Sequence, residues 1–278
     1  MAKYTGRFAA AAIGLLLLGA CSSAPAKPPE IRLRRNGAEQ QLELANRQAE
    51  RGDLAGALSL LELARQLAVA ADDTGLRVRT SLSRGNVLFY QGRRDEAAAE
   101  WTAAEADAAG DPALAALVRI YIARGGLLRA AAEGRGAEAA DSAIQELNRA
   151  LNQLREDKIS TALGWTVIGL AEKEGGRFSA AESAVQKALA LHLGENYLEQ
   201  AAYDWYLIAS IRSVAGKYGE AEAALEEALA LDRRSENSWG LAMDWRALAE
   251  VYRKAGKSSQ AEAAAARSAE ILQALGRP

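Results

Sequence analysis

The apolar positions of this 278-residue chain follow a helical spacing and recur in units of about 40 residues. In the last three units they lie three, four or seven positions apart, in two runs separated by a glycine, which is the spacing of one face of an α-helix. No run of alternating β-branched and polar residues indicates a strand. The pattern predicts an all-α protein with about six helix-turn-helix repeats over residues 36–278.

Six glycines mark the expected turn inside each repeat. They recur at a near-constant interval of about 40 residues, and an alanine follows each of them at the fifth position. They are Gly52, Gly92, Gly134, Gly176, Gly216 and Gly256. Because glycine has no Cβ, it takes the left-handed conformation of a tight turn at little cost. The last three units have a glycine or alanine seven residues before the turn glycine. In the unit around Gly134, Gly126 and Leu127 stand near this position, so the unit can be aligned with the others in more than one register, a few residues apart.

The last three repeats resemble the tetratricopeptide repeat (TPR). The Trp-x-x-Leu-Gly spacing of that family matches Trp165–Gly169, Trp205–Ala209 and Trp245–Ala249. The period of about 40–42 residues is longer than the usual 34 and is similar to the long repeats of kinesin light chains. The tyrosine that the family has four residues before the turn glycine is kept only as Tyr252. The resemblance implies a TPR-like αα-superhelix, a solenoid in which tryptophans pack between helices and small residues let helices approach closely.

The first twenty residues are typical of a secretory signal. Lys3 and Arg7 precede an uncharged apolar run, Phe8 to Gly19, which is shorter than the ~20 residues that a membrane span needs. We therefore interpret residues 1–20 as a signal peptide and residues 21–35 as a segment that begins with a cysteine and continues as a tether. Three of the chain's five prolines lie within residues 22–30, which disfavours a helix there.

The end of this signal resembles a bacterial lipobox. Leu18, Gly19 and Ala20 precede Cys21, the only cysteine of the chain, so no disulfide accounts for it. The resemblance implies a lipoprotein: a diacylglyceryl group on Cys21, cleavage before it, and anchoring through acyl chains such as palmitate. Ser22 in place of aspartate favours the outer membrane and its periplasmic face in a Gram-negative cell. A short membrane anchor and a plain secreted protein are the alternatives.

Composition argues against several classes of function. Formal net charge is −2; removing residues 1–20 leaves 32 basic and 36 acidic residues, a net charge of −4, and no basic stripe suggests nucleic-acid binding. The basic residues Arg32, Arg34 and Arg35 have two interpretations, contact with anionic headgroups or the solvated start of the first helix. With one histidine and no free cysteine after lipidation, we expect no metal site and no cofactor.

Catalysis has little support in the sequence. His192 is the only histidine, and it lies near the end of an expected helix, where packing or capping is its common role. The triplet Gly256-Lys257-Ser258 lacks the earlier glycine of a phosphate-binding loop. The carboxylates around Glu222 and Glu226 fit the exposed face of an amphipathic helix. We expect the protein not to be an enzyme.

The strongest candidate site lies in the last two repeats. The family resemblance implies that the positions two before and one after the repeat tryptophan face the concave groove, and that the same face continues one helical turn further on. In the repeat of Trp165 these positions hold Leu163 and Thr166, which we expect on the same surface. The candidate groove residues are Tyr203, Tyr206, Ser210, Ser213, Met243, Arg246, Glu250 and Arg253. Tyrosine, methionine and arginine are enriched in the cores of protein interfaces. The alternative is that Tyr203 and Tyr206 simply cover neighbouring helices.

Two functions follow from these features. The first is a membrane-anchored scaffold that binds a segment of a partner protein in the bacterial envelope, in the assembly of an envelope, pilus or secretion complex. The alternative is a periplasmic small-molecule-binding protein that works with a solute transporter.

Overall fold

The computed structural model describes residues 32–154 and 157–276. The expected signal peptide, Cys21 with its lipobox, and the proline-rich part of the tether lie outside the described residues. Helix α1 begins at Leu33, so residues 33–35, which the sequence pattern placed in the tether, form its first turn. Among the helices of the described residues, none is both long and apolar enough to cross a bilayer.

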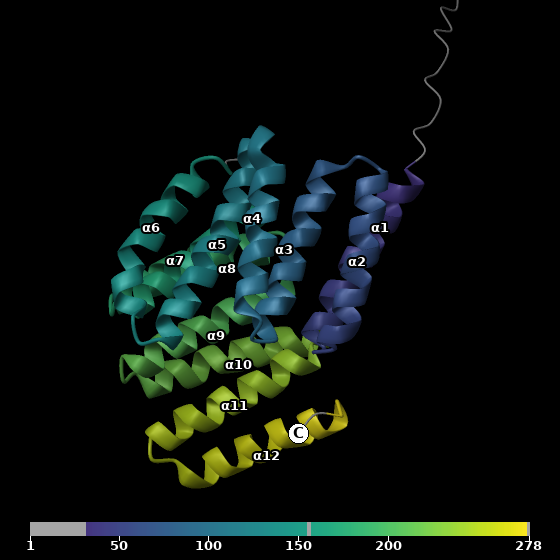
Figure 1. Ribbon diagram of the computed structural model, residues 1–278. Coiled ribbons are helices and arrows are strands. Elements are labelled where there is room, and N and C mark those ends of the chain that lie inside the picture. Colours follow the sequence, from purple (N-terminus) through teal and green to yellow (C-terminus); the bar gives the residue numbers. More distant parts are fainter. Residues whose placement is uncertain (1–31, 155–156, 277–278) are drawn as a thin grey trace, which may run out of the picture. The chain divides into compact units, whose positions relative to one another are not determined.

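Twelve α-helices make up the described part of the chain (Figure 1). In order they are α1 (Leu33–Glu50), α2 (Leu54–Ala70), α3 (Thr74–Tyr90), α4 (Arg94–Asp107), α5 (Pro112–Ala132), α6 (Gly136–Leu151), α7 (Lys158–Glu174), α8 (Phe178–Gly194), α9 (Leu198–Val214), α10 (Tyr218–Arg234), α11 (Ser238–Lys254) and α12 (Ser258–Ala274). A short 3-10 turn, Ala108–Gly110, follows α4. Odd- and even-numbered helices pack as consecutive pairs, and each pair packs on the next. The predicted TPR-like arrangement of six helix-turn-helix repeats is confirmed.

The turn inside each repeat is a left-handed glycine. All six predicted glycines have φ between 73° and 79°. In the fifth repeat the backbone N–H of Lys217, just after Gly216, donates to the carbonyl of Arg212 at 2.9 Å, which satisfies a free carbonyl at the end of α9. Three of the turns between repeats place a residue other than glycine at positive φ, namely Asp72, Asn196 and Glu236.

The third repeat departs from the predicted phase. In the other five repeats the alanine at the fifth position after the glycine is buried, whereas here Ala139 is only half-buried and its neighbour Ala140 is fully buried. Leu127 is buried at the position where the other repeats have a glycine or alanine ahead of the turn. The larger side chain of Leu127 keeps α5 and α6 from crossing as closely as the helices of the other repeats. The buried face of α6 is therefore shifted by one residue along the sequence.

Glycines on helix faces permit close helix crossings. A Cβ on Gly169 of α7 would lie 2.3 Å from Val185 Cγ2 of α8, which confirms the predicted role of the small residue. In the second repeat, Trp101 of α4 occupies the repeat position equivalent to that of Val185. It fits because Gly85 of α3 and Gly125 of α5 border its indole ring, and a Cβ on either glycine would come within 2.2 Å of that ring.

The repeat tryptophans Trp165, Trp205 and Trp245 are half-buried and pack against the largest hydrophobic cluster. Their interpretation as packing residues is confirmed. Trp101, which has no counterpart in that pattern, is buried, and its indole N–H donates to the carbonyl of Leu82 at 3.4 Å.

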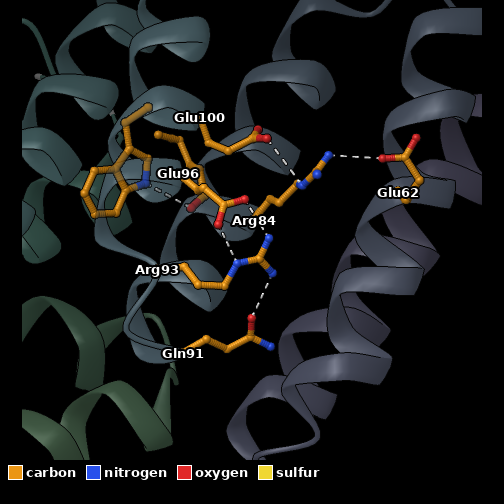
Figure 2. A network of polar contacts seen from close by, with 8 residues as sticks. Glu62, Arg84, Gln91, Arg93, Glu96 and Glu100 are labelled. Carbon is orange, nitrogen blue, oxygen red and sulfur yellow. Dashed lines mark hydrogen bonds and ion pairs between the residues drawn. The ribbon is translucent and has the colours of Figure 1, made fainter.

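Polar contacts connect the first two repeats (Figure 2). Arg84 of α3 lies between Glu62 of α2 and Glu100 of α4, with N–O distances of 3.1 Å and 3.3 Å. At the start of α1, Arg34 donates to the carbonyl of Ala70 at 3.0 Å and Arg35 pairs with Asp73 at 2.9 Å. These two arginines therefore attach the first helix to α2 and the start of α3, which supports the second of their two interpretations.

Candidate binding groove

A hollow of about 430 Å³ lies between α9 and α11, the first helices of the last two repeats. These helices contact each other directly, and equivalent residues on them are one repeat apart in the sequence. Six of the eight predicted groove residues line this hollow: Tyr206, Ser210, Ser213, Arg246, Glu250 and Arg253. The repeat therefore brings these side chains together on one surface, the α9–α11 groove.

The other two predicted residues lie beside the hollow and do not line it. The ring of Tyr203 stacks on that of Tyr206, with centroids 6.1 Å apart and an interplanar angle of 12°, and 43% of Tyr203 is exposed. The sulfur of Met243 accepts a hydrogen bond from Arg246 Nη2 at 3.0 Å. Tyr203 extends the aromatic surface of the groove, and Met243 positions the guanidinium of Arg246.

The groove combines apolar and charged groups. Val214 and Lys254, which are not among the predicted groove residues, also line the hollow, and 54% of Val214 is exposed. Glu250 pairs with Arg253, which leaves Arg246 and Lys254 without a carboxylate partner among the described residues. An exposed apolar edge with a net positive charge suits a segment that carries apolar and acidic side chains.

The groove does not continue onto α7. The residues of α7 at the matching repeat positions are Leu163 and Thr166, which the sequence pattern placed on the same surface. Thr166 is instead buried, and its hydroxyl donates to Asp204 Oδ1 at 2.8 Å. Leu163 is half-buried and packs against the core. The expectation of a surface running across three repeats is therefore wrong at Thr166, because a buried carboxylate needs a hydrogen-bond donor there.

Three residues at the same repeat positions were missed in the earlier repeats. Tyr121 and Arg124 stand at the same two positions ahead of Gly134 that Tyr203 and Tyr206 occupy ahead of Gly216. In the second repeat the first of these positions holds Arg79. Counting back from every turn glycine, and not only from the tryptophan of the last three repeats, would have found them.

His192 takes part in a buried polar network. Its Nδ1 lies 2.6 Å from Asp204 Oδ2, and Thr166 donates to the other oxygen of that carboxylate. Asp204 is fully buried and His192 is 4% exposed. Burial raises the pKa of Asp204 above its ordinary value, although the hydrogen bonds from His192 and Thr166 act in the opposite direction. The network joins α8 to α9 and offers no access to a substrate, which agrees with the packing interpretation of His192.

A second buried pair occupies the equivalent positions of the next repeat. Asp232 of α10 and Asp244 of α11 interact through their carboxyl groups, and each residue is 3% exposed. Asn237 Nδ2 donates to Asp232 Oδ1 at 3.0 Å, whereas Asp244 Oδ2 has no partner among the described residues. A Cβ on Gly240 would lie 2.0 Å from Asp232 Oδ2, so this glycine makes room for the carboxyl group.

The pKa values of both carboxyl groups lie far above the ordinary value for aspartate. Burial raises the pKa of Asp232 to about 7, and burial together with the charge of Asp232 raises that of Asp244 to about 8. Glu199 of α9 adds a further negative charge near Asp232, and Arg233 acts in the opposite direction on Asp244. A carboxylic acid donating to a carboxylate is the arrangement that two buried acids adopt in contact.

No group of three or more histidine, cysteine or acidic residues in the described part of the chain is arranged to hold a metal ion. A second hollow, of about 450 Å³, lies on α11 and α12 beside Trp245 and Tyr252. It borders the last helix of the described chain, and the predicted groove residues do not contribute to it.

The chain matches no family model and no curated protein. It is similar in structure to a Rap protein complexed with Competence and Sporulation Factor, with a TM-score of 0.62, 13% identity, and 87% of this chain and 78% of that chain covered. BtubC (BKLC) from P. vanneervenii has a TM-score of 0.57 at 20% identity over 86% and 92% of the two chains. PilW, a widely conserved type IV pilus biogenesis factor, has a TM-score of 0.51 at 16% identity over 85% and 92%. At these identities the similarity shows the fold alone.

Proposed function

We propose that this protein is a lipid-anchored scaffold of the bacterial envelope, whose α9–α11 groove binds a segment of a partner protein. The observation that carries this proposal is the convergence of Tyr206, Arg246, Glu250 and Arg253 on one hollow between two rigid helices. Aligned anchors on a rigid helical repeat are what binding of a peptide or helix requires. Aromatic and arginine side chains supply most of the energy in such interfaces.

The small-ligand alternative has one supporting observation. A volume of about 430 Å³ lies in the range of small-molecule pockets. Such pockets are mostly apolar, however, with few polar groups, whereas Arg246, Glu250, Arg253 and Lys254 all line this one. The charged lining favours a protein segment. A photoreactive residue at position 206 is therefore expected to form an adduct with one partner protein in intact cells.

The assembly role and the location belong to the same proposal. One structural neighbour is a pilus biogenesis factor and another was crystallised with a bound factor, which is compatible with binding and assembly roles for this fold. The lipobox-like run Leu18 to Ala20 before Cys21 supports anchoring in the outer membrane with the repeats in the periplasm.

Cys21→Ser is expected to move the protein from the membrane fraction to the soluble fraction. Serine cannot form the thioether that attaches the diacylglyceryl group, so the acyl chains that hold the protein at the bilayer are lost. Fractionation of cells with detection of an epitope tag measures the change, and Ser22→Ala is the matched control that keeps the thiol. If the Cys21→Ser protein stays in the membrane fraction to the wild-type extent, the lipoprotein interpretation is wrong.

A further inference from the structure

Arg124 of α5 is held by neutral groups. Its Nη2 donates to the hydroxyl of Tyr90 at 2.6 Å, its Nη1 donates to Asn86 Oδ1 at 3.4 Å, and its Cζ lies 5.8 Å from the centroid of the Tyr90 ring. Tyr121 of α5 and Tyr203 of α9 are its other electrostatic neighbours. Asn86 and Tyr90 of α3 therefore contact the guanidinium, and Tyr121 and Tyr203 lie near enough to influence its charge. We call these five residues the Arg124 cluster.

The charge of Arg124 is not balanced within the described part of the chain. No carboxylate there forms an ion pair with it, and its hydrogen-bond acceptors, a phenol and an amide, are uncharged. Phenols ionise only at about pH 10, so Tyr121 and Tyr203 are uncharged at physiological pH and do not balance the guanidinium. A second cation, Arg79 of α3, acts on Tyr121 and likewise has no carboxylate partner among the described residues.

The guanidinium of Arg124 has N–H groups left over that can bind an anion. Of its N–H donors, two are used by Tyr90 and Asn86, and Nε makes no hydrogen bond within the described residues. A carboxylate accepts two parallel N–H bonds from one guanidinium, so the unused N–H groups of Arg124 can bind one.

The Arg124 cluster is continuous with the α9–α11 groove. Tyr203 belongs to the cluster and stacks on Tyr206, which lines the hollow. Tyr206 and Arg124 also occupy the same position relative to the turn glycine in their respective repeats. A segment that lies along the groove can therefore reach from Tyr206 across Tyr203 to Arg124.

We propose that the Arg124 cluster is an anion-binding subsite that takes an acidic side chain of the bound partner segment. This inference rests on the proposed function, because it identifies the chemistry of the segment that the groove holds. The charge of Arg124 and Arg79 provides the complementarity, and the rings of Tyr90, Tyr121 and Tyr203 provide the apolar contacts on either side of the acidic residue.

The test uses the full repeat region and a pair of labelled peptides. One peptide alternates glutamate with serine and leucine, and the other has glutamine in place of every glutamate. Fluorescence anisotropy at low salt is expected to show that the wild-type protein binds the glutamate peptide about tenfold more tightly than the glutamine peptide. Arg124→Gln is expected to reduce this preference to about twofold or less, while Arg149→Gln, an exposed arginine of α6, leaves it unchanged.

Arg124→Lys is a second variant that keeps the charge but loses the forked donors, and it is expected to retain part of the preference. The proposal is overturned if wild-type protein binds the two peptides equally or binds neither, or if the preference persists in Arg124→Gln. These results leave the groove itself in place, because binding at Tyr206 is tested separately by the adduct at position 206. If no protein adduct forms at position 206 but the wild-type protein still prefers the glutamate peptide, the proposed function is contradicted and the anion-binding subsite is not.

Discussion

Gly125→Ala is expected to lower the free energy of unfolding by about 2 kcal/mol, whereas the same change at the adjacent Gly126 is expected to raise it by about 1 kcal/mol. A Cβ on Gly125 would lie 2.2 Å from Trp101 Cζ3, and Gly85 blocks the indole on its other side, so the ring has no room to move. A Cβ on Gly126 meets no atom within 4 Å, and alanine favours the helix there.

Both variants are measured by urea unfolding followed by circular dichroism, beside wild-type protein at the same pH and salt. Gly126→Ala is the matched control because it makes the same change one residue away on the same helix. Equal stabilisation by the two changes would mean that Trp101 does not pack against Gly125. Since Trp101 lies between α3 and α5, that result would also contradict the packing of the second repeat against the third.

Asp244→Asn is expected to raise the free energy of unfolding by about 3 kcal/mol above pH 8 and to change it little near pH 5. The pKa values of Asp232 and Asp244, about 7 and about 8, are above the ordinary value of 3.8. The folded state therefore retains protons that the unfolded state has released between about pH 4 and pH 8. The free energy of unfolding of the wild type therefore falls as the pH rises from about 4 to about 8, and it is constant above about pH 8.

The asparagine removes this loss because its amide donates to the Asp232 carboxylate without a shared proton. Unfolding midpoints in urea at closely spaced pH values from 5 to 9 measure the slope, which is expected to be clearly smaller in Asp244→Asn than in the wild type. An unchanged slope would mean that the two carboxyl groups are not in contact in the folded protein.

Asp204→Asn is the matched control at the equivalent position of the preceding repeat. Asp204 faces His192 and Thr166 rather than a second carboxyl group, so the same substitution weakens a hydrogen-bonded network. Its expected effect at pH 8 is a loss of about 1–2 kcal/mol. Opposite signs at equivalent positions of two neighbouring repeats would follow from the different partners that α8 and α10 supply.

The turns and the helix pairs were predictable because their causes are local. A left-handed turn strongly favours glycine whatever surrounds it, and a close helix crossing requires a small residue, so both features recur with the repeat. Gly216 and Gly169 are examples in which one residue type fixes the backbone or the approach of one neighbouring helix.

The third repeat and the buried acids were not predictable in this way because they depend on contacts between repeats. Gly125 is significant only because Trp101 of the preceding repeat lies against it. Asp244 resembles any exposed acidic residue of an amphipathic helix until Asp232 of the preceding repeat is placed beside it. Pairings of this kind depend on the angle between repeats, which the period alone does not give.

The candidate groove was predicted in part for the same reason. The family phase predicts Tyr206 and Arg246 on one surface, and both line the hollow, because that phase is a property of each first helix. It failed at Thr166, where Asp204 of the next repeat attracts the hydroxyl into the core. Arg124 was missed because the third repeat has no tryptophan from which to count.

The most direct test of the groove is crosslinking in intact cells from a photoreactive residue at position 206, with mass spectrometry of the adducts. The control places the probe at Glu226, an exposed residue of α10 that does not line the hollow. We expect a single strong protein adduct from position 206 that is absent from position 226. No protein adduct from position 206, or one shared with position 226, would contradict the assignment of the groove as the binding site for a partner protein.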